Sequence, residues 1–221
     1  MSSFENILQF GPKVGHIKLS NDESKELYGI CLDSTDDFRQ GLVGFILEEK
    51  NITAKFKTSK VYNKIKKYCN DYLKEVDPGY YKNIIEKENF DDIFDCTKAW
   101  YNKQVHMEHN PLHNHFRTAD LVTVIYPKII LDEKDNDFIV NKTTNKKQTG
   151  QINFVYGTQN DLNGFGSTEI CLDPQEGDLL IFPATLSHYT TPVLGDSVRY
   201  SISCNWSIHT HIKRFAHKEI K

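Results

Sequence analysis

Three histidines from two distant parts of this chain have the types and spacing that suit a metal site. His113 and His115 stand two residues apart in NPLHNHF. On an extended chain such residues point to one face, about 6.6 Å apart. Two imidazoles placed in this way can converge on one ion at about 2.0–2.2 Å. His188 follows the apolar segment GDLLIFPATL, and loops that follow strands often carry function.

The histidines alone leave a second interpretation open. An HxH pair recurs at His209 and His211, close to the C-terminus. A pair of solvated histidines in a loop, or one structural histidine beyond a strand, is as ordinary as a ligand. The metal hypothesis therefore depends on other features of the chain.

The segment SVRYSISCNWSI supplies one such feature, because its residues alternate cleanly between two faces. One face is apolar and comprises Val198, Tyr200, Ile202, Cys204, Trp206 and Ile208. The other is polar and comprises Arg199, Ser201, Ser203, Asn205 and Ser207. A polar face is ordinarily the solvated side of a sheet, but small serines beside one arginine also suit a strand that lines a barrel interior. There Arg199 and Ser201 could bind a carboxylate at two points.

The surrounding sequence predicts a β-rich C-terminal half. Residues 121–131 are almost all apolar or β-branched, which predicts a strand buried on both faces. Residues 151–157, entered after a polar connection at 141–149, predict another strand. Further short strands follow with Gly, Asp and Pro between them, including 179–182. This pattern indicates a sandwich or barrel.

The N-terminal part has a helical pattern. Residues 59–76 place apolar side chains at intervals of three to four, as in an amphipathic helix. We expect one mostly β domain with flanking helices, in which residues 1–96 form a helical support, 97–210 form the β core and 211–221 form a basic tail.

Composition excludes several classes of protein. The net charge of −3 over 221 residues gives no electrostatic case for nucleic-acid binding. Five scattered cysteines without a CxxC pair indicate a reducing compartment. The N-terminus lacks the apolar run of a signal peptide, and no stretch approaches the roughly 20 apolar residues of a membrane span. We therefore expect a cytoplasmic protein without a membrane or nucleic-acid partner.

Four segments together resemble a known superfamily. They are NPLHNHFRTADLVTVIYP (110–127), GQINFVYG (150–157), GDLLIFPATLSH (177–188) and RYSISCNW (199–206). Their order is similar to that of the 2-oxoglutarate/iron(II) oxygenases, and above all to small oxygenase-like proteins of marine phages and bacteria. GLVGFILEEKNI (41–52) is expected to match a helical segment that precedes the core.

The resemblance implies a fold, cofactors and roles. The fold would be a double-stranded β-helix, also called a jelly roll, of cupin-like type. His113 and His188 would be the first and the distal ligands of iron(II). Arg199, assisted by Ser201, would bind the C5 carboxylate of 2-oxoglutarate. With O2, such an enzyme couples oxidative decarboxylation of 2-oxoglutarate to oxidation of a substrate.

The chain departs from the family pattern at the middle ligand. His115 stands where that pattern has a carboxylate, which implies a three-histidine site. Alternatively, a nearby carboxylate completes the usual facial triad. Asp120 is the first candidate for it, and Glu108 is the second. Asp120 could also orient a ligand imidazole or form a turn at the start of its strand.

Two rival functions remain at this stage. Three histidines with a bound water also describe a zinc hydrolase or hydratase. A non-catalytic β-barrel that acts as a binding or structural module is the other. For the oxygenase, the substrate would be an unknown small molecule or peptide, a homodimer is possible, and a phage-encoded protein would act in the host cytoplasm.

Overall fold

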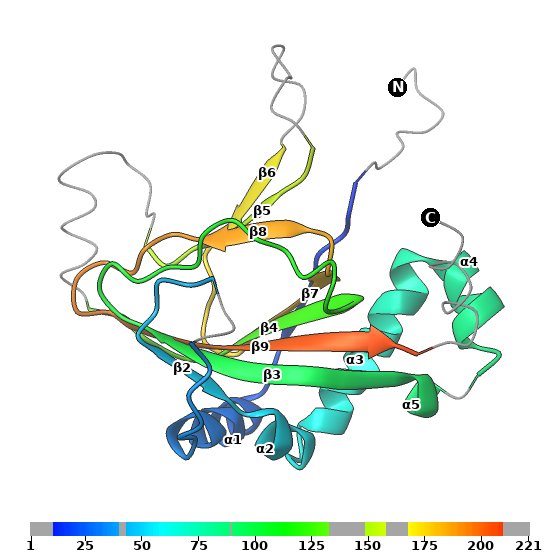
Figure 1. Ribbon diagram of the computed structural model, residues 1–221, viewed down its shortest axis with the longest axis horizontal. Coiled ribbons are helices and arrows are strands. Elements are labelled where there is room, and N and C mark those ends of the chain that lie inside the picture. The colour runs from blue at the N-terminus through cyan, green and yellow to red at the C-terminus, as the bar shows by residue number, and fades with distance from the viewer. Residues whose placement is uncertain (1–10, 40–42, 89, 133–148, 158–167, 210–221) are drawn as a thin grey trace.

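The computed structural model describes residues 11–39, 43–88, 90–132, 149–157 and 168–209. The predicted basic tail at 211–221 lies outside these residues, as does the predicted connection at 141–149 apart from its last residue. Within the described ranges, the chain forms two antiparallel sheets and a set of helices (Figure 1).

The larger sheet has six strands. In spatial order they are β1 (Gly15–Lys18), β7 (Asp178–Pro183), β4 (Leu121–Ile130), β9 (Val198–Ile208), β3 (Phe94–Gln104) and β2 (Glu48–Asn51). The smaller sheet comprises β6 (Glu169–Leu172), β5 (Ile152–Val155) and β8 (Ser187–Thr190). Figure 1 shows the smaller sheet above the middle of the larger one. The architecture is the expected jelly-roll core, mostly β, with an N-terminal helical layer.

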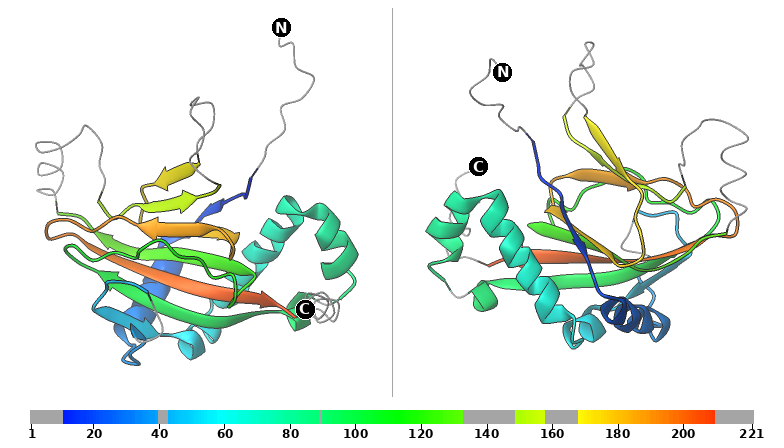
Figure 2. Two further views of the ribbon diagram at one scale, coloured as in Figure 1. Left: turned by 45° about the horizontal axis from the view of Figure 1, so that its top comes forward. Right: turned by 180° about the vertical axis from the view of Figure 1, so that it is seen from behind.

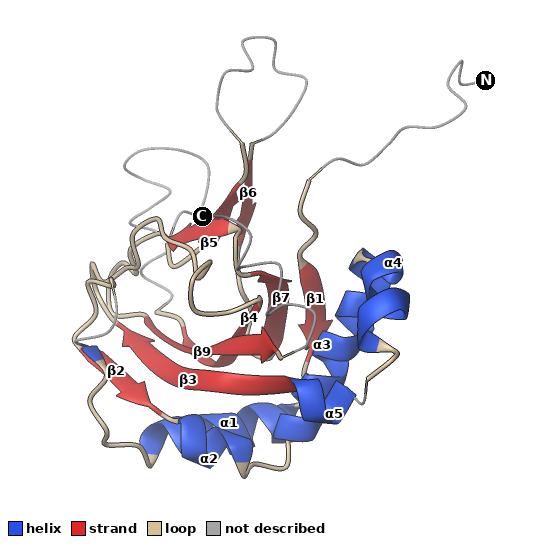
Figure 3. Ribbon diagram, turned by 45° about the vertical axis from the view of Figure 1, so that its right-hand side comes forward, coloured by secondary structure: helices blue, strands red, loops and turns tan. Residues whose placement is uncertain are grey.

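Helices cover the outer face of the larger sheet and extend beyond one end of it (Figures 2 and 3). They are α1 (Asn21–Leu32), α2 (Thr53–Lys57), α3 (Tyr62–Val76), α4 (Pro78–Tyr80), the π-helix η2 (Tyr81–Ile85) and α5 (Phe90–Ile93). A capping box begins α1, because the Ser20 side chain accepts from the Glu23 amide and the Glu23 carboxylate accepts from the Ser20 amide. No helix among the described residues is long and apolar enough to cross a membrane.

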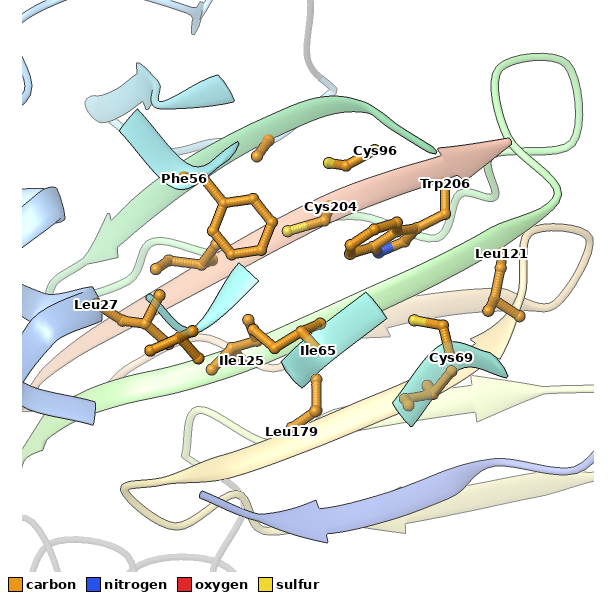
Figure 4. Packing of buried hydrophobic residues seen from close by; sticks show 14 of the residues in the cluster. Leu27, Phe56, Ile65, Cys69, Cys96, Leu121, Ile125, Leu179, Cys204 and Trp206 are labelled. Carbon is orange, nitrogen blue, oxygen red and sulfur yellow. The ribbon is translucent and has the colours of Figure 1, made fainter. Parts of the chain in front are cut away.

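The main hydrophobic core lies between these helices and the sheet. Leu27 of α1, Phe56 of α2 and Ile65 of α3 are fully buried against sheet residues that include Leu179 and Trp206 (Figure 4). Because each helix buries its apolar side on the sheet, helices and strands share one core. The helical layer therefore stabilises the sheet that carries the polar residues on its other face.

Most elements were predictable from the sequence, with two corrections. The helix predicted at 59–76 is observed as α3, and the strand predicted at 121–131 as β4. The helix expected at 41–52 is wrong, because this segment ends in the strand β2. The predicted helical support is likewise not wholly helical, since β1 and β2 extend the larger sheet at its two edges. β2 pairs with β3, and this pairing overrides its charged, weakly β-forming sequence EEKN.

Candidate metal and cosubstrate site

Three histidine side chains meet at one point between the two sheets. Suitable ligand atoms of His113, His115 and His188 all lie within 4.8 Å of one another. The ring centroids of His113 and His188 are 4.4 Å apart, and those of His115 and His188 are 5.3 Å apart. Among the described residues, this is the one group of three or more His, Cys, Asp or Glu side chains with such geometry. His209 of the second HxH pair lies outside it, and His211 lies outside the described residues.

Main-chain hydrogen bonds hold the two histidine segments together. The amide of His113 donates to the carbonyl of His188 at 3.0 Å, and the amide of His188 donates to the carbonyl of His113 at 2.9 Å. The amide of His115 donates to the carbonyl of Ala184 at 2.8 Å. The loop after β3 is thereby attached to β8, so residues 75 positions apart in the sequence share one site.

Backbone carbonyl groups orient two of the imidazoles. Nδ1 of His113 is 2.7 Å from the carbonyl oxygen of Pro111, and Nδ1 of His188 is 3.0 Å from that of Leu186. A carbonyl can only accept, so in these contacts Nδ1 carries the proton and Nε2 keeps a free lone pair. The side-chain amide of Asn205 lies beside His115 and opposes the lowering of its pKa.

Burial keeps these imidazoles neutral. It lowers the pKa of His188 to about 3 and that of His115 to about 4, and it also lowers the pKa of His113. The proximity of His113 lowers the pKa values of the other two further. Since a metal binds the neutral imidazole, the site is ready for an ion at neutral pH without first losing protons. Three imidazole nitrogens fit a divalent ion such as iron, zinc, nickel or copper.

Arg199 lies on the cavity side of β9 and is only 4% exposed. Its Nε donates to Oε1 of Gln104 at 2.9 Å; Nη2 donates to the same oxygen, and Nη1 donates to the carbonyl of Gly150. No carboxylate among the described residues forms an ion pair with it. Burial lowers the pKa of the guanidinium, which nevertheless remains a cation. The cavity therefore contains a fixed buried positive charge.

A cavity of about 520 Å³ joins these groups. Arg199, Ser201 and Tyr126 line it together with the three histidines. The guanidinium carbon of Arg199 is 5.5 Å from the centre of the Tyr126 ring. This volume lies in the range of small-molecule sites. The polar face predicted for β9 thus faces the cavity, and its apolar face packs on the helices.

The two alternative carboxylates are engaged elsewhere in the structure. Oδ2 of Asp120 accepts from the amide of Ile208 at 2.8 Å, while the Asp120 amide donates to the carbonyl of Trp206. The oxygens of Glu108 accept from the amides of Leu47 and Val105, each at 3.0 Å. Neither residue belongs to the group formed by the three histidines.

Several residues of this site were not predicted from the sequence. Gln104 orients Arg199, and Thr190 of β8 accepts from Nε2 of Gln104 at 3.2 Å. Glu49 of β2 and Asn110 line the same cavity. The alternation of Trp100, Asn102 and Gln104 along β3 could have indicated a polar inner face, because it has the same period as that of β9.

Comparisons with known proteins indicate the class of enzyme. A family model described as "Putative 2OG-Fe(II) oxygenase" matches residues 98–205, which run from β3 to β9. This match covers just under half of the chain and identifies in it a domain of the 2-oxoglutarate/iron(II) oxygenase family. The enzymes of this family use Fe(II), 2-oxoglutarate and O2. The chain is accordingly a 2-oxoglutarate-dependent Fe(II) dioxygenase. It couples oxidative decarboxylation of 2-oxoglutarate to oxidation of a further substrate. Neither a zinc hydrolase nor a non-catalytic module is favoured.

Solved structures of this oxygenase fold are similar over most of the chain. A prolyl-4-hydroxylase from Pseudomonas putida is 12% identical with a TM-score of 0.55, covering 88% of this chain and 92% of that one. A prolyl hydroxylase from Trichoplax adhaerens, solved with a peptide fragment of hypoxia inducible factor, is 17% identical with a TM-score of 0.54, covering 93% and 87%. HygX from Streptomyces hygroscopicus, solved with nickel and 2-oxoglutarate, is 10% identical with a TM-score of 0.53, covering 88% and 82%. No curated protein matches.

Proposed function

We propose that His113, His115 and His188 together hold the iron of this oxygenase, and that Arg199 with Ser201 binds the C5 carboxylate of 2-oxoglutarate. The observation that carries the proposal is the buried cation of Arg199 beside three neutral imidazoles, without a carboxylate partner among the described residues. A buried charge is costly unless it is paired, so a ligand that supplies a carboxylate accounts for its position.

The protein residues divide the work of binding and orientation. Three side chains leave coordination positions open for the ketoacid end of 2-oxoglutarate and for O2. When bound, these partners supply the oxidising power, and the protein supplies geometry and exclusion of water. Gln104 and the Gly150 carbonyl occupy three N–H groups of Arg199, which fixes the guanidinium plane. The two remaining N–H groups are then available for a carboxylate.

Ser201 has a secondary role in this proposal. It follows Arg199 on the same face of β9, lines the cavity and is 4% exposed. Its hydroxyl can donate one hydrogen bond to the carboxylate that Arg199 binds. Tyr126 is 1% exposed and lines the same cavity, where its ring restricts the cosubstrate end.

Paired variants test the choice of the middle ligand. His115→Ala is expected to lose bound iron, whereas His115→Asp, which restores the carboxylate of the usual facial triad, is expected to retain it. Asp120→Asn should bind iron normally if the protein folds. Metal content after anaerobic loading with Fe(II) measures all three. Iron retained in His115→Ala and lost in folded Asp120→Asn would assign the middle position to Asp120 instead.

We also propose the domain extent, the cellular location and the partners of this enzyme. We infer one oxygenase domain over the whole chain, supported by the core that helices and strands share. We infer that it acts in the cytoplasm, or in the host cytoplasm if a phage encodes it, since its five cysteines are free and four of them are buried. A peptide or small-molecule substrate without a nucleic-acid component, and a homodimer, remain proposals that sizing by light scattering and substrate screening would test.

A further inference from the structure

One carboxylate in the wall of the cavity has no role in the site described above. Glu49 lies in β2, where it pairs in register with Asn102 of β3, which in turn pairs with Ser201 of β9. The side chain of Glu49 lines the cavity that contains the histidines and Arg199, and the residue is 1% exposed. The larger sheet thus presents a buried acid two strands away from the proposed cosubstrate residues.

This carboxylate has no partner among the described residues. Its Oε1 is fully buried without a hydrogen bond, and it forms no ion pair with any residue in the described ranges. Two neighbouring acids, Glu48 and Glu108, differ from Glu49 because their carboxylates have hydrogen-bond partners. Oε1 of Glu48 accepts from the Tyr101 hydroxyl at 2.9 Å, and its Oε2 pairs with Lys103 at 3.1 Å. Both oxygens of Glu108 accept from backbone amides.

The isolation of Glu49 has an electrostatic consequence. Burial and the nearby carboxylate of Glu108 raise the pKa of Glu49 to about 7, although the charge of Arg39 acts in the opposite direction. Native proteins leave few buried polar groups unsatisfied, and those that remain often have a binding or catalytic function. A donor brought by a ligand would satisfy this oxygen.

Other acceptor oxygens lie close to Glu49. Oδ1 of Asn102 is also buried without a partner among the described residues. A Cβ added to Gly44 would lie 2.3 Å from Oδ1 of Asn110 and 3.1 Å from Oε1 of Glu49, so the backbone packs directly against both oxygens. A ligand group with N–H donors would satisfy these oxygens, and a positive charge would complement the acid.

Neither the metal nor the cosubstrate is the missing partner. Glu49 is not part of the group of ligand atoms formed by the three histidines. 2-Oxoglutarate is an anion, and Glu49 would repel it. The remaining occupant of the cavity is the substrate that the enzyme oxidises. Val43 and Trp100 line the cavity as well, which suits an aliphatic stem beside the charged group.

We propose that Glu49 binds a cationic group, an ammonium or guanidinium, of the substrate and so positions the aliphatic stem of that substrate for oxidation. The inference rests on the proposed function, because it assigns a substrate class to the same cavity. It makes Glu49 a specificity residue: an amine or guanidine is preferred over a neutral compound of the same shape.

Matched fragments test the proposal without a known substrate. The probes are n-butylguanidinium and its neutral isostere n-butylurea. Binding is measured by calorimetry at pH 8, with the protein loaded with zinc and 2-oxoglutarate so that no turnover occurs. The wild-type protein should bind n-butylguanidinium at least about ten-fold more tightly than n-butylurea, as expected for one or two charge-assisted hydrogen bonds.

Two single-charge variants locate the effect. Glu49→Gln should bind n-butylguanidinium about ten-fold more weakly and n-butylurea without change. Glu48→Gln is the matched control, because its carboxylate lies next in sequence and already bonds to Tyr101 and Lys103; we expect it to bind both probes as the wild type does. If Glu49→Gln does not fold, the comparison of the two probes on the wild type still decides the matter.

The possible outcomes separate this inference from the proposed function. Failure of the wild type to bind 2-oxoglutarate in the same titrations would contradict the assignment of Arg199. Normal binding of 2-oxoglutarate, with equal affinity for the two probes or no affinity for either, overturns the role of Glu49 alone. Equal weakening in Glu49→Gln and Glu48→Gln would likewise overturn it, because the effect would then come from overall charge.

Discussion

The two faces of the larger sheet are both buried, yet they differ in how their side chains are satisfied. The face toward the helices is apolar, and its few polar atoms are paired, as where Nε1 of Trp206 donates to Thr123 at 3.0 Å. The face toward the cavity carries Arg199 and Glu49, both almost fully buried and neither paired with an opposite charge among the described residues. The first arrangement stabilises the fold, whereas the second costs stability unless a ligand supplies the opposite charge.

The largest effect is expected on the helix face. Trp206 is fully buried and stacks on Phe94, with ring centroids 5.2 Å apart, and on Tyr62 at 5.7 Å. Trp206→Ala should reduce the free energy of unfolding by about 3–5 kcal/mol, because it leaves a large cavity. Urea unfolding measures this loss. The control Ser203→Ala, on the cavity face of the same strand, should change the value by less than about 1 kcal/mol. Comparable losses in the two variants would contradict the distinction between the faces.

Loss of a histidine should impair metal binding and leave the fold intact. His188→Ala removes a proposed ligand of the iron. Loss of a residue that only orients a ligand typically weakens metal binding by roughly 10–100-fold, so the affinity of this variant for Fe(II) should fall by more than that. Anaerobic titration with Fe(II) measures the affinity. His106→Ala is a suitable control, since that exposed histidine lies outside the cluster. Unchanged iron content in His188→Ala would remove this residue from the metal site.

Removal of the buried arginine should separate cosubstrate binding from metal binding. Arg199→Ala is expected to weaken 2-oxoglutarate at least about ten-fold, because charge-assisted hydrogen bonds contribute about 1.5–3 kcal/mol each. Iron should still bind. Consumption of 2-oxoglutarate at limiting concentration gives the affinity, and the exposed Arg117→Ala serves as a control. Wild-type consumption in Arg199→Ala would show that the carboxylate is bound elsewhere.

The smallest effect concerns the pH dependence of stability. The pKa of Glu49 is raised in the folded state to about 7, so the folded protein holds this proton at pH values where the unfolded chain has released it. Stability from this group is therefore greatest below the unfolded pKa and declines as pH rises toward 7. Solvent in the cavity screens this charge, so the penalty of ionising it is about 1 kcal/mol.

Glu49→Gln removes this titration. The variant should unfold about 2–4 °C higher than the wild type at pH 8, and the difference should vanish near pH 4. Thermal unfolding at both pH values measures it, and the charges that act on Glu49, namely Glu108, Arg39 and Asp37, remain in both proteins. A variant that is less stable at pH 8 would indicate a structural role for the carboxylate.

Prediction from the sequence was correct where the local pattern of apolar and polar residues was clear. The alternation in β9 predicted which of its residues face the core and which form a second, polar face, because strand side chains alternate with a period of two. It left open whether that polar face is solvated. The helix expected at 41–52 was wrong, and this error concealed Glu49, whose place in the cavity depends on pairing between β2 and β3.

By itself, the sequence determined the β-rich core, the amphipathic helix at 59–76, the two faces of β9 and the histidines that belong to the family pattern. Only the tertiary structure decided that His113 and His188 pair through their backbones in an isolated β-bridge. It also decided that Gln104 and Gly150 accept hydrogen bonds from Arg199, and that Asp120 accepts one from the backbone amide of Ile208. The physical reason is the distance along the sequence over which each kind of interaction acts. Periodicity and turn residues act over a few positions, whereas sites of this kind form between strands whose register is set by long-range pairing and by burial on both sides of the sheet.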